Sequence, residues 1–220
     1  MLTRPLISVA IITLNEAKNI QACIESAVNL GPVIVVDAES SDQTAEIARQ
    51  CGATVFQRSW TNFSEQKQSA VETCDTDWVL VLDADERLVP SLLAEISHLD
   101  LSDPGVAYAI PRTTFFLGRA IKYCGWRPDY VVRLFNKRRV RFNDRPVHES
   151  VIGYQSLEYL TESIHHFSYP TRADVIRKID QYSRLGAEQI ARDQRAHWFS
   201  PFAHASWSFF RTYVLKAGFL

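Results

Sequence analysis

Two carboxylates that follow a hydrophobic run are the strongest chemical signal in this sequence. Residues 78–82 form an uninterrupted apolar run, and Asp83-Ala84-Asp85 come directly after it. Such a run predicts a strand buried on both faces, and open α/β sheets bind ligands at the carboxyl ends of their strands. In an extended chain Asp83 and Asp85 point to the same side, where they would suit a hard divalent cation. Capping acids for the next helix are the alternative interpretation.

The flanking sequence alternates apolar runs with amphipathic segments, which predicts a doubly wound α/β sheet. Further buried strands are expected at residues 6–14 and 33–36, and another strand is expected at 53–56. Asn15 is expected to cap the first helix, and the capping-box pattern from Ser40 to Gln43 is expected to open the second. A third helix is expected over 62–73, and Pro90 suits the first position of a fourth.

The pattern changes after residue 105. Shorter strands are expected at 106–111, 130–135 and 140–142. Basic and aromatic residues lie between them, so we expect a mixed extension of the sheet that covers the site. Residues 171–195 carry a long, heavily charged helical pattern.

Composition favours one sizeable globular domain with a divided charge. Residues 1–111 carry 6 Lys/Arg against 16 Asp/Glu, whereas residues 112–145 carry 10 against 2. This division indicates a cation in one place and an anionic ligand in another. The acidic first half and the lack of a nucleic-acid-binding motif argue against nucleic acid as a partner.

The cysteines and the N-terminal residues favour a cytoplasmic protein. The four cysteines are scattered without CxxC spacing, which is typical of free, buried thiols in a reducing compartment. The apolar run at 6–14 is too short and too strand-like for a signal peptide or a membrane span.

Several ordered motifs resemble the inverting glycosyltransferases of family 2. They are Thr13-Leu14-Asn15-Glu16, the segment from Val35 to Thr44, and Asp83-Ala84-Asp85, and the likeness covers roughly residues 5–100. Three later segments resemble the bacterial subgroup that adds glucose or similar sugars to the lipopolysaccharide inner core. They are Gly125–Tyr130, Arg133-Leu134-Phe135 and Val147-His148-Glu149.

The resemblance implies a GT-A fold, an α/β mixed sheet with helices on both faces. Residues 1–170 would form the catalytic domain, with a nucleotide-sugar-binding half (1–104) and an acceptor-binding half (105–170). Residues 171–220 would form a C-terminal helical segment. The implied activity is metal-dependent inverting transfer of a hexose, with glucose preferred, from a UDP-sugar to a saccharide acceptor, with lipopolysaccharide inner core the expected acceptor.

By the same resemblance, Thr13, Asn15, Glu16 and Asp37 hold the base and ribose of the donor. Asp37 at a strand end can accept a hydrogen bond from a uracil N–H, and a turn acid is the alternative. Lys67 could reach a phosphate or the ribose, with a solvated helix lysine as the alternative.

The carboxylate motif then acquires a role in holding Mg²⁺ or Mn²⁺, which offsets the charge that develops on the departing diphosphate. The resemblance implies that Asp85 contacts the metal most directly, while Asp83 binds the ribose or helps through water. Family members often add a later histidine, for which His165 and His166 are equal candidates. A structural histidine pair is the alternative.

Inverting transfer needs one base that deprotonates the acceptor hydroxyl. Family 2 enzymes commonly use an acid of a Glu-Asp pair, but this chain has His148-Glu149 there. Glu149 is the first candidate and His148 the second, with a structural partner of Arg145 as the alternative for Glu149. Trp126 is a candidate sugar platform or a core residue. Arg133 is a candidate contact to phosphates or acidic sugars, or part of a solvated basic face.

The C-terminal segment is aromatic and basic. From His197 onward, eight of 24 residues are aromatic, and none is acidic. This composition suits a helix on the anionic inner face of the cytoplasmic membrane, near a lipid-linked acceptor. A helix packed on the catalytic domain or on a second subunit is the alternative, and the oligomeric state stays open.

Two other functions compete. A sugar-nucleotide nucleotidyltransferase would need a glycine-rich basic loop after the first strand, and Leu14-Asn15-Glu16-Ala17 is not one. A catalytically inactive sugar-nucleotide-binding module would keep the same ligand residues.

Overall fold

The computed structural model describes residues 6–143, 150–169, 171–176, 179, 180, 183 and 200–216. The chain divides into two compact units. The first contains Met1–Arg112 and Tyr130–His166, and the second contains Thr113–Asp129 and Phe167–Leu220.

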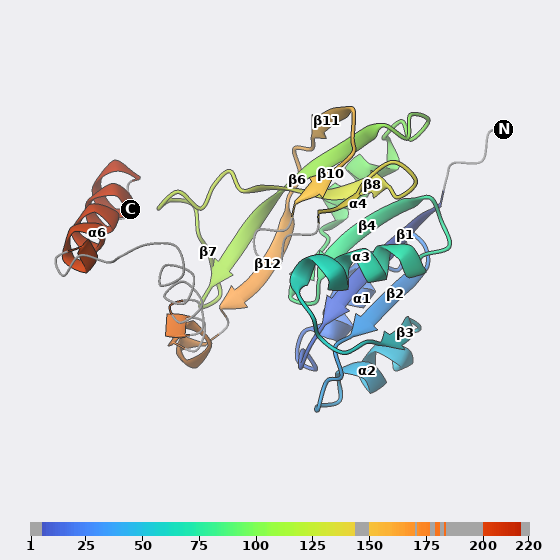
Figure 1. The fold of residues 1–220 in the computed structure, drawn as a ribbon, viewed down its shortest axis with the longest axis horizontal. Helices are drawn as coiled ribbons and strands as arrows, with labels where there is room; N and C mark the ends of the chain where they lie inside the picture. Colours follow the sequence, from blue (N-terminus) through green and yellow to red (C-terminus); the bar gives the residue numbers. More distant parts are fainter. Residues whose placement is uncertain are drawn as a thin grey trace. The chain divides into compact units, whose positions relative to one another are not determined.

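Four parallel strands form the centre of the first unit. They are β1 (Ile7–Thr13), β2 (Val33–Asp37), β3 (Thr54–Gln57) and β4 (Trp78–Asp83). They lie side by side in the order β3-β2-β1-β4 (Figure 1). The first, second and fourth strands are buried along almost their whole length, as their uninterrupted apolar runs predict.

Antiparallel strands extend this sheet beyond β4. Next to β4 lies β8 (Tyr130–Asn136), and β6 (Val106–Phe116) pairs with β8. The order continues to β12 (Ile164–Tyr169) and the two-residue β5 (Glu86–Arg87), while β11 (Ser156–Tyr159) pairs with β6 in parallel. The expected mixed extension is confirmed. β6, however, runs to Phe116 rather than ending at Pro111.

Helices cover both faces of the parallel part. They are α1 (Ile20–Ala27), α2 (Thr44–Gln50), α3 (Phe63–Thr73) and α4 (Pro90–Ser97). Alternate residues of β1 and β4 belong to two separate hydrophobic clusters, one with α1, α2 and α4, and the other with α3. Burial of each Ile or Leu side chain stabilises the fold by about 2 kcal/mol. Because side chains alternate between the two faces, a one-residue slip of a strand would move each of them from one cluster to the other.

Two of the expected helix starts are wrong. α1 begins at Ile20 rather than after Asn15, and α2 begins at Thr44 without a side-chain cap from the Ser40–Gln43 segment. Asn15 instead has a φ of 56° and accepts a hydrogen bond from the Ser41 N–H at 2.8 Å. Side chains that local patterns assign to helix caps are therefore used to join the loop after β1 to the loop after β2.

The other two helix starts are confirmed. Asn62 caps α3 by accepting a hydrogen bond from the Glu65 N–H at 2.9 Å, and Pro90 opens α4. All four cysteines are free, as expected, and Cys23 and Cys74 are buried. Burial raises the pKa of the Cys74 thiol to about 11.

Aromatic side chains are prominent in the second unit. β7 (Arg119–Ala120) pairs with the end of β6, and the Phe115 and Phe167 rings stack at 4.7 Å. α6 (Ser200–Phe209) continues into a π-helical turn, η1 (Phe210–Leu215). Much of the helical pattern predicted at 171–195 lies outside the described residues. No helix among the described residues is long and apolar enough to cross a membrane.

Candidate functional site

The strand ends that carry the sequence motifs meet at one edge of the sheet. β1 and β2 pair with Thr13 opposite Asp37, and β1 and β4 pair with Ile12 opposite Asp83. Their carboxyl ends therefore lie next to one another, where the order of parallel strands places a ligand site. Thr13, Asp37 and Asp83 are 24 and 46 positions apart in the sequence, and the parallel register brings them together.

Asp83 is held by two cations of the same chain. Its Oδ1 lies 3.1 Å from Lys67 Nζ, and its Oδ2 accepts a hydrogen bond from Arg133 Nη2 at 2.7 Å. Lys67 comes from α3 and Arg133 from β8, and both side chains are about 5% exposed or less. Lys67 is therefore not the solvated helix lysine of the alternative interpretation, and both oxygens of Asp83 already face positive charge.

The expectation that the chain is extended from Asp83 to Asp85, which would put both carboxylates on the same side, is wrong. β4 ends at Asp83, and Ala84 and Asp85 form a turn that leads into β5. The two carboxylates consequently have different partners. Asp85 Oδ2 lies 3.4 Å from His166 Nε2, whereas Asp83 binds Lys67 and Arg133.

Glu86 is a member of this ionic cluster that the sequence did not indicate. It is fully buried, accepts a hydrogen bond from Arg133 Nη2 at 2.6 Å and another from the Asp83 N–H at 2.9 Å, and lies 3.6 Å from Arg112 Nη1. In the sequence, Glu86 is the third acid after the strand, and its position suggests an acid near the start of the next helix. Its partners lie up to 47 residues away, so the only available signal was the basic residues of β6 and β8.

Two members of this ionic cluster, Asp83 and Arg133, have strongly shifted pKa values. Burial alone would raise the pKa of the Asp83 carboxyl, but Arg133 and Lys67 hold it well below its usual range. Burial would lower the pKa of the Arg133 guanidinium, but Asp83 and Glu86 raise it well above its usual value. The stability that Asp83 contributes is therefore present above its unfolded-state pKa of about 3.9, and is lost as the pH falls towards the folded-state value.

His166 and His165 have different surroundings. In β12, His166 pairs with Glu86 of β5 and His165 with Arg87, which brings His166 beside Asp85. Neighbouring strand residues point to opposite faces, so His165 points away from the face that His166 shares with Asp85. The structure thus distinguishes two histidines that the sequence left equivalent.

Asp85 and His166 suit a divalent cation that is completed by a ligand. Mg²⁺ and similar ions are often held by one or two protein groups together with substrate phosphates and water. Among the described residues no group of three or more His, Cys, Asp or Glu could hold a metal by itself. A carboxylate and an imidazole 3.4 Å apart fit a shared ion, provided that the phosphates of a nucleotide supply the remaining oxygens.

The loops beyond β1 and β2 are joined around Asp37. This fully buried carboxylate accepts hydrogen bonds from the Ser40 N–H at 3.0 Å and the Ser40 hydroxyl at 2.5 Å. The Asn15 N–H donates to the Ser40 hydroxyl, and the Glu16 N–H donates to Thr44 Oγ1, each at 2.8 Å. Asp37 therefore shapes the turn that surrounds it, as the turn-acid interpretation requires.

Thr13 has a buried hydroxyl that makes no hydrogen bond to any described residue. It lies at the end of β1 opposite Asp37. An unpaired buried hydroxyl costs about 1–3 kcal/mol, so a ligand that reached Thr13 would gain from pairing with it.

The remaining candidate residues, Trp126, Arg133, His148 and Glu149, lie in different surroundings or outside the described residues. Trp126 belongs to the second unit, where its half-exposed ring contacts Tyr169 edge to face at 6.0 Å. Arg133 is buried against Asp83 and Glu86, and this does not favour direct contact with an acceptor. His148 and Glu149 lie outside the described residues, so their roles stay predictions.

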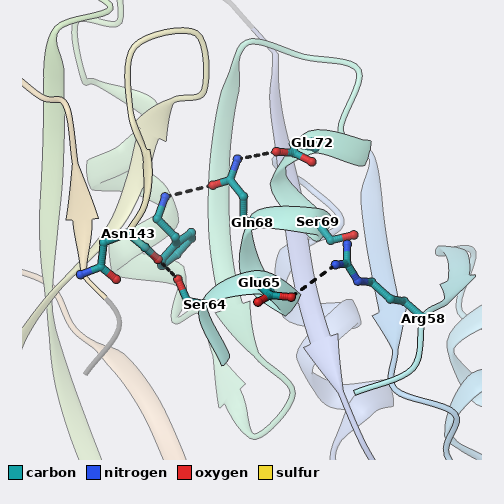
Figure 2. Close-up of a pocket in the computed structure, with 8 residues that line it drawn as sticks. Arg58, Ser64, Glu65, Gln68, Ser69, Glu72 and Asn143 are labelled. Carbon is teal, nitrogen blue, oxygen red and sulfur yellow. Dashed lines mark hydrogen bonds and ion pairs between the residues drawn. The ribbon is translucent and has the colours of Figure 1, made fainter. Parts of the chain in front are cut away.

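A small pocket lies away from these carboxylates. It has a volume of about 190 Å³ and lies between the outer face of α3 and β9 (Arg141–Phe142), which pairs with β10 (Val151–Ile152) (Figure 2). Gln68 accepts a hydrogen bond from the Phe142 N–H there, and Ser64 donates to the Asn143 carbonyl. None of the motif residues lines this pocket.

Comparison with known proteins agrees with this geometry. The family model described as "Glycosyl transferase family 2" matches residues 8–156. An uncharacterized glycosyltransferase of Rickettsia felis is 30% identical over 228 residues, covering 97% of this chain and 81% of that protein. The lipopolysaccharide core biosynthesis glycosyltransferase LpsC of Rhizobium meliloti is 30% identical over 198 residues, covering 83% and 71%.

Solved structures share the fold. The mannosyltransferase PcManGT of Pyrobaculum calidifontis, in complex with GDP-Man and Mn²⁺, has a TM-score of 0.57 at 20% identity and covers 94% of this chain and 70% of that one. TarS of S. aureus, in complex with UDP, has a TM-score of 0.56 at 15% identity, and the match spans 73% of this chain and 60% of that chain. The chain therefore belongs to glycosyltransferase family 2 and has the GT-A fold.

Proposed function

We propose that this glycosyltransferase is metal-dependent and inverting, and that it moves a hexose, with glucose preferred, from a UDP-sugar to a saccharide acceptor. The observation that carries the proposal is the contact between Asp85 and His166. It lies at the edge of the sheet where β1, β2 and β4 end at Thr13, Asp37 and Asp83. A carboxylate and an imidazole in this position suit the cation that accompanies a nucleoside diphosphate.

The donor half of the proposal rests on the strand ends. Asp37 and Thr13 would meet the base and ribose, with Asn15 and Glu16 in the adjacent loop. TarS binds UDP and PcManGT binds GDP-Man in their structures, so the shared fold accommodates either nucleotide. We propose a uridine nucleotide, as the resemblance implies, with Asp37 acting at the base through the Ser40 turn that its buried carboxylate holds.

The diphosphate would meet Asp85, His166 and the nearby cations. A bound Mg²⁺ or Mn²⁺ supplies positive charge that offsets the charge developing on the leaving diphosphate. Arg133 and Lys67 keep Asp83 ionised, and Glu86 fixes Arg133 and the Asp83 backbone in place. Asp83 would thus bind the ribose, or help to hold the metal through water. Arg133 would keep the Asp83 carboxylate in position.

The acceptor half of the proposal rests on residues that the resemblance supplied. Glu149, or else His148, would take the proton from the acceptor hydroxyl as that oxygen attacks the sugar carbon and the nucleoside diphosphate departs. Trp126 would offer its indole face to a sugar ring. The similarity to LpsC supports lipopolysaccharide inner core as the acceptor.

A lipid-linked acceptor would place this enzyme at the inner face of the cytoplasmic membrane. Phe202, Trp207 and Phe209 of α6 are each more than half exposed, and Arg211 and Lys216 follow in a stretch, residues 197–220, whose sequence contains no acid. Exposed aromatic rings beside basic residues suit an anionic lipid surface. We therefore propose that α6 and η1 contact the membrane peripherally.

The membrane proposal predicts lipid-dependent sedimentation. The protein is expected to sediment with phosphatidylglycerol vesicles and much less with phosphatidylcholine vesicles, because Arg211 and Lys216 favour anionic lipid. Replacing Trp207 and Phe209 by serine should abolish sedimentation, whereas the control Tyr154→Ser should not. Equal sedimentation of wild type and the double variant would contradict this contact.

A thermal-shift screen tests the donor and the metal together. UDP-, GDP- and TDP-sugars are added with and without Mn²⁺, and one UDP-sugar is expected to raise Tm only when Mn²⁺ is present, because binding to the folded state stabilises it. No response to any sugar nucleotide would contradict the proposal. A stabilising donor without sugar transfer to any acceptor would favour an inactive binding module, and nucleoside triphosphate consumption with a sugar phosphate would favour a nucleotidyltransferase.

A further inference from the structure

An exposed aromatic pair lies between β3 and α3. The rings of Trp60 and Phe63 meet edge to face with centroids 4.8 Å apart and an interplanar angle of 85°. Trp60 is 42% exposed and Phe63 is 44% exposed. Each therefore keeps a large part of its aromatic surface in contact with solvent.

The segment that leads to Trp60 is fixed to the loop beyond Asp37. β3 pairs with β2 as far as Gln57 opposite Asp37, and the Arg58 N–H donates to the Asp37 carbonyl at 3.0 Å. The Ser59 hydroxyl donates to Glu39 Oε1 at 2.8 Å. Trp60 is the next residue, so it leaves the sheet beside the strand end that carries Asp37.

Phe63 connects the same pair to the other strand end. Phe63 and Lys67 are four residues apart on α3 and share one face of the helix. Lys67 Nζ lies 6.0 Å from the centroid of the Phe63 ring and 3.1 Å from Asp83 Oδ1. The aromatic pair consequently connects the carboxyl end of β3, which lies beside Asp37, to the face of α3 whose Lys67 binds Asp83.

We propose that Trp60 and Phe63 form the surface on which the nucleobase of the donor stacks, and this inference rests on the proposed function. The flat face of a base stacks on aromatic side chains whatever the base is. A base on this surface has Asp37 towards the β2 end, and its diphosphate extends towards Lys67 and Asp85. The pair thus contributes binding affinity for the nucleoside, and the polar groups near Asp37 determine which base is bound.

Calorimetric titration tests this platform by separating the base from the phosphates. UDP and inorganic pyrophosphate, each with Mn²⁺, are titrated into wild type, Trp60→Ala, Phe63→Ala, Trp60→Phe and the control Tyr159→Ala, which truncates an exposed aromatic on β11. Loss of one stacking partner is expected to raise the Kd of UDP about tenfold in either alanine variant. The Kd of pyrophosphate should not change, and Trp60→Phe and Tyr159→Ala should bind UDP as wild type does.

Four results would overturn the inference. Unchanged UDP binding by both alanine variants would remove the platform while leaving the proposed function intact. An equal loss of UDP and pyrophosphate binding would show that the rings only support the local structure. If wild type bound neither ligand, the proposed function would fail and the platform with it. A rise in acceptor KM with unchanged UDP affinity would assign the pair to the acceptor instead.

Discussion

Replacing Asp85 by asparagine is expected to lower kcat/KM for sugar transfer on the order of 10³-fold, because the variant removes a negative charge that would hold the cation against the diphosphate. Asparagine keeps the size of the side chain, and Asp85 lies in a turn rather than in the core. The variant should therefore fold normally. Release of UDP from the donor identified by the thermal-shift screen provides the measurement.

The control for this prediction is another ion-paired aspartate that lies outside the site. Asp77 also accepts a salt bridge, from Arg138 at 2.6 Å, but both side chains are well exposed. Asp77→Asn is expected to leave kcat/KM within about twofold, since exposed ion pairs contribute little. Activity of Asp85→Asn close to that of Asp77→Asn would show that Asp85 has no part in catalysis.

Glu86→Ala is expected to cause the largest loss of stability, about 3–5 kcal/mol in the free energy of unfolding. Breaking a buried ion pair by removal of one partner leaves the other charge uncompensated, and here Arg133 would retain only Asp83. Urea unfolding followed by circular dichroism measures this change. An exposed glutamate on a strand, Glu158, serves as the control, and Glu158→Ala should change the unfolding free energy by less than about 0.5 kcal/mol.

Glu86→Gln separates the positioning role of Glu86 from its contribution to stability. The amide keeps the volume and one acceptor oxygen but weakens the hold on Arg133, so Asp83 and the turn with Asp85 should shift. A displacement of about 1 Å can lower kcat on the order of 10²-fold. A variant that is folded at the assay temperature yet has wild-type kcat and wild-type Mn²⁺ dependence would contradict this role.

The parallel half of the fold could be predicted from the sequence because its signals are local. Buried strands such as β1 and β4 are uninterrupted apolar runs, and Asn62 and Pro90 mark helix starts through contacts within one turn. The helix starts expected after Asn15 and at Ser40 failed for the opposite reason. Their side chains bond to residues of another loop, and Asn15 and Ser41 are 26 positions apart.

The sequence predicted which strand ends carry the candidate site, but it did not predict which charged side chains pair there. The spacing of Asp83 and Asp85 indicated a cation, but it did not reveal the turn that separates them. The distinction between His165 and His166 depends on the register of β12 against β5, which are far apart in the sequence. Glu86 and Arg133 were ambiguous for the same reason, since a buried pair and a solvated charge have the same local sequence.

The central claim is that Asp85 and His166 share a divalent cation with the donor diphosphate. A crystal structure of the protein with UDP and Mn²⁺, with anomalous data collected at the manganese edge, tests it most directly. We predict one anomalous peak in coordination contact with Asp85, His166 and phosphate oxygens of UDP, with Lys67 and Arg133 still bound to Asp83. Bound UDP with no manganese at Asp85, and Asp85 still paired with His166, would contradict the claim.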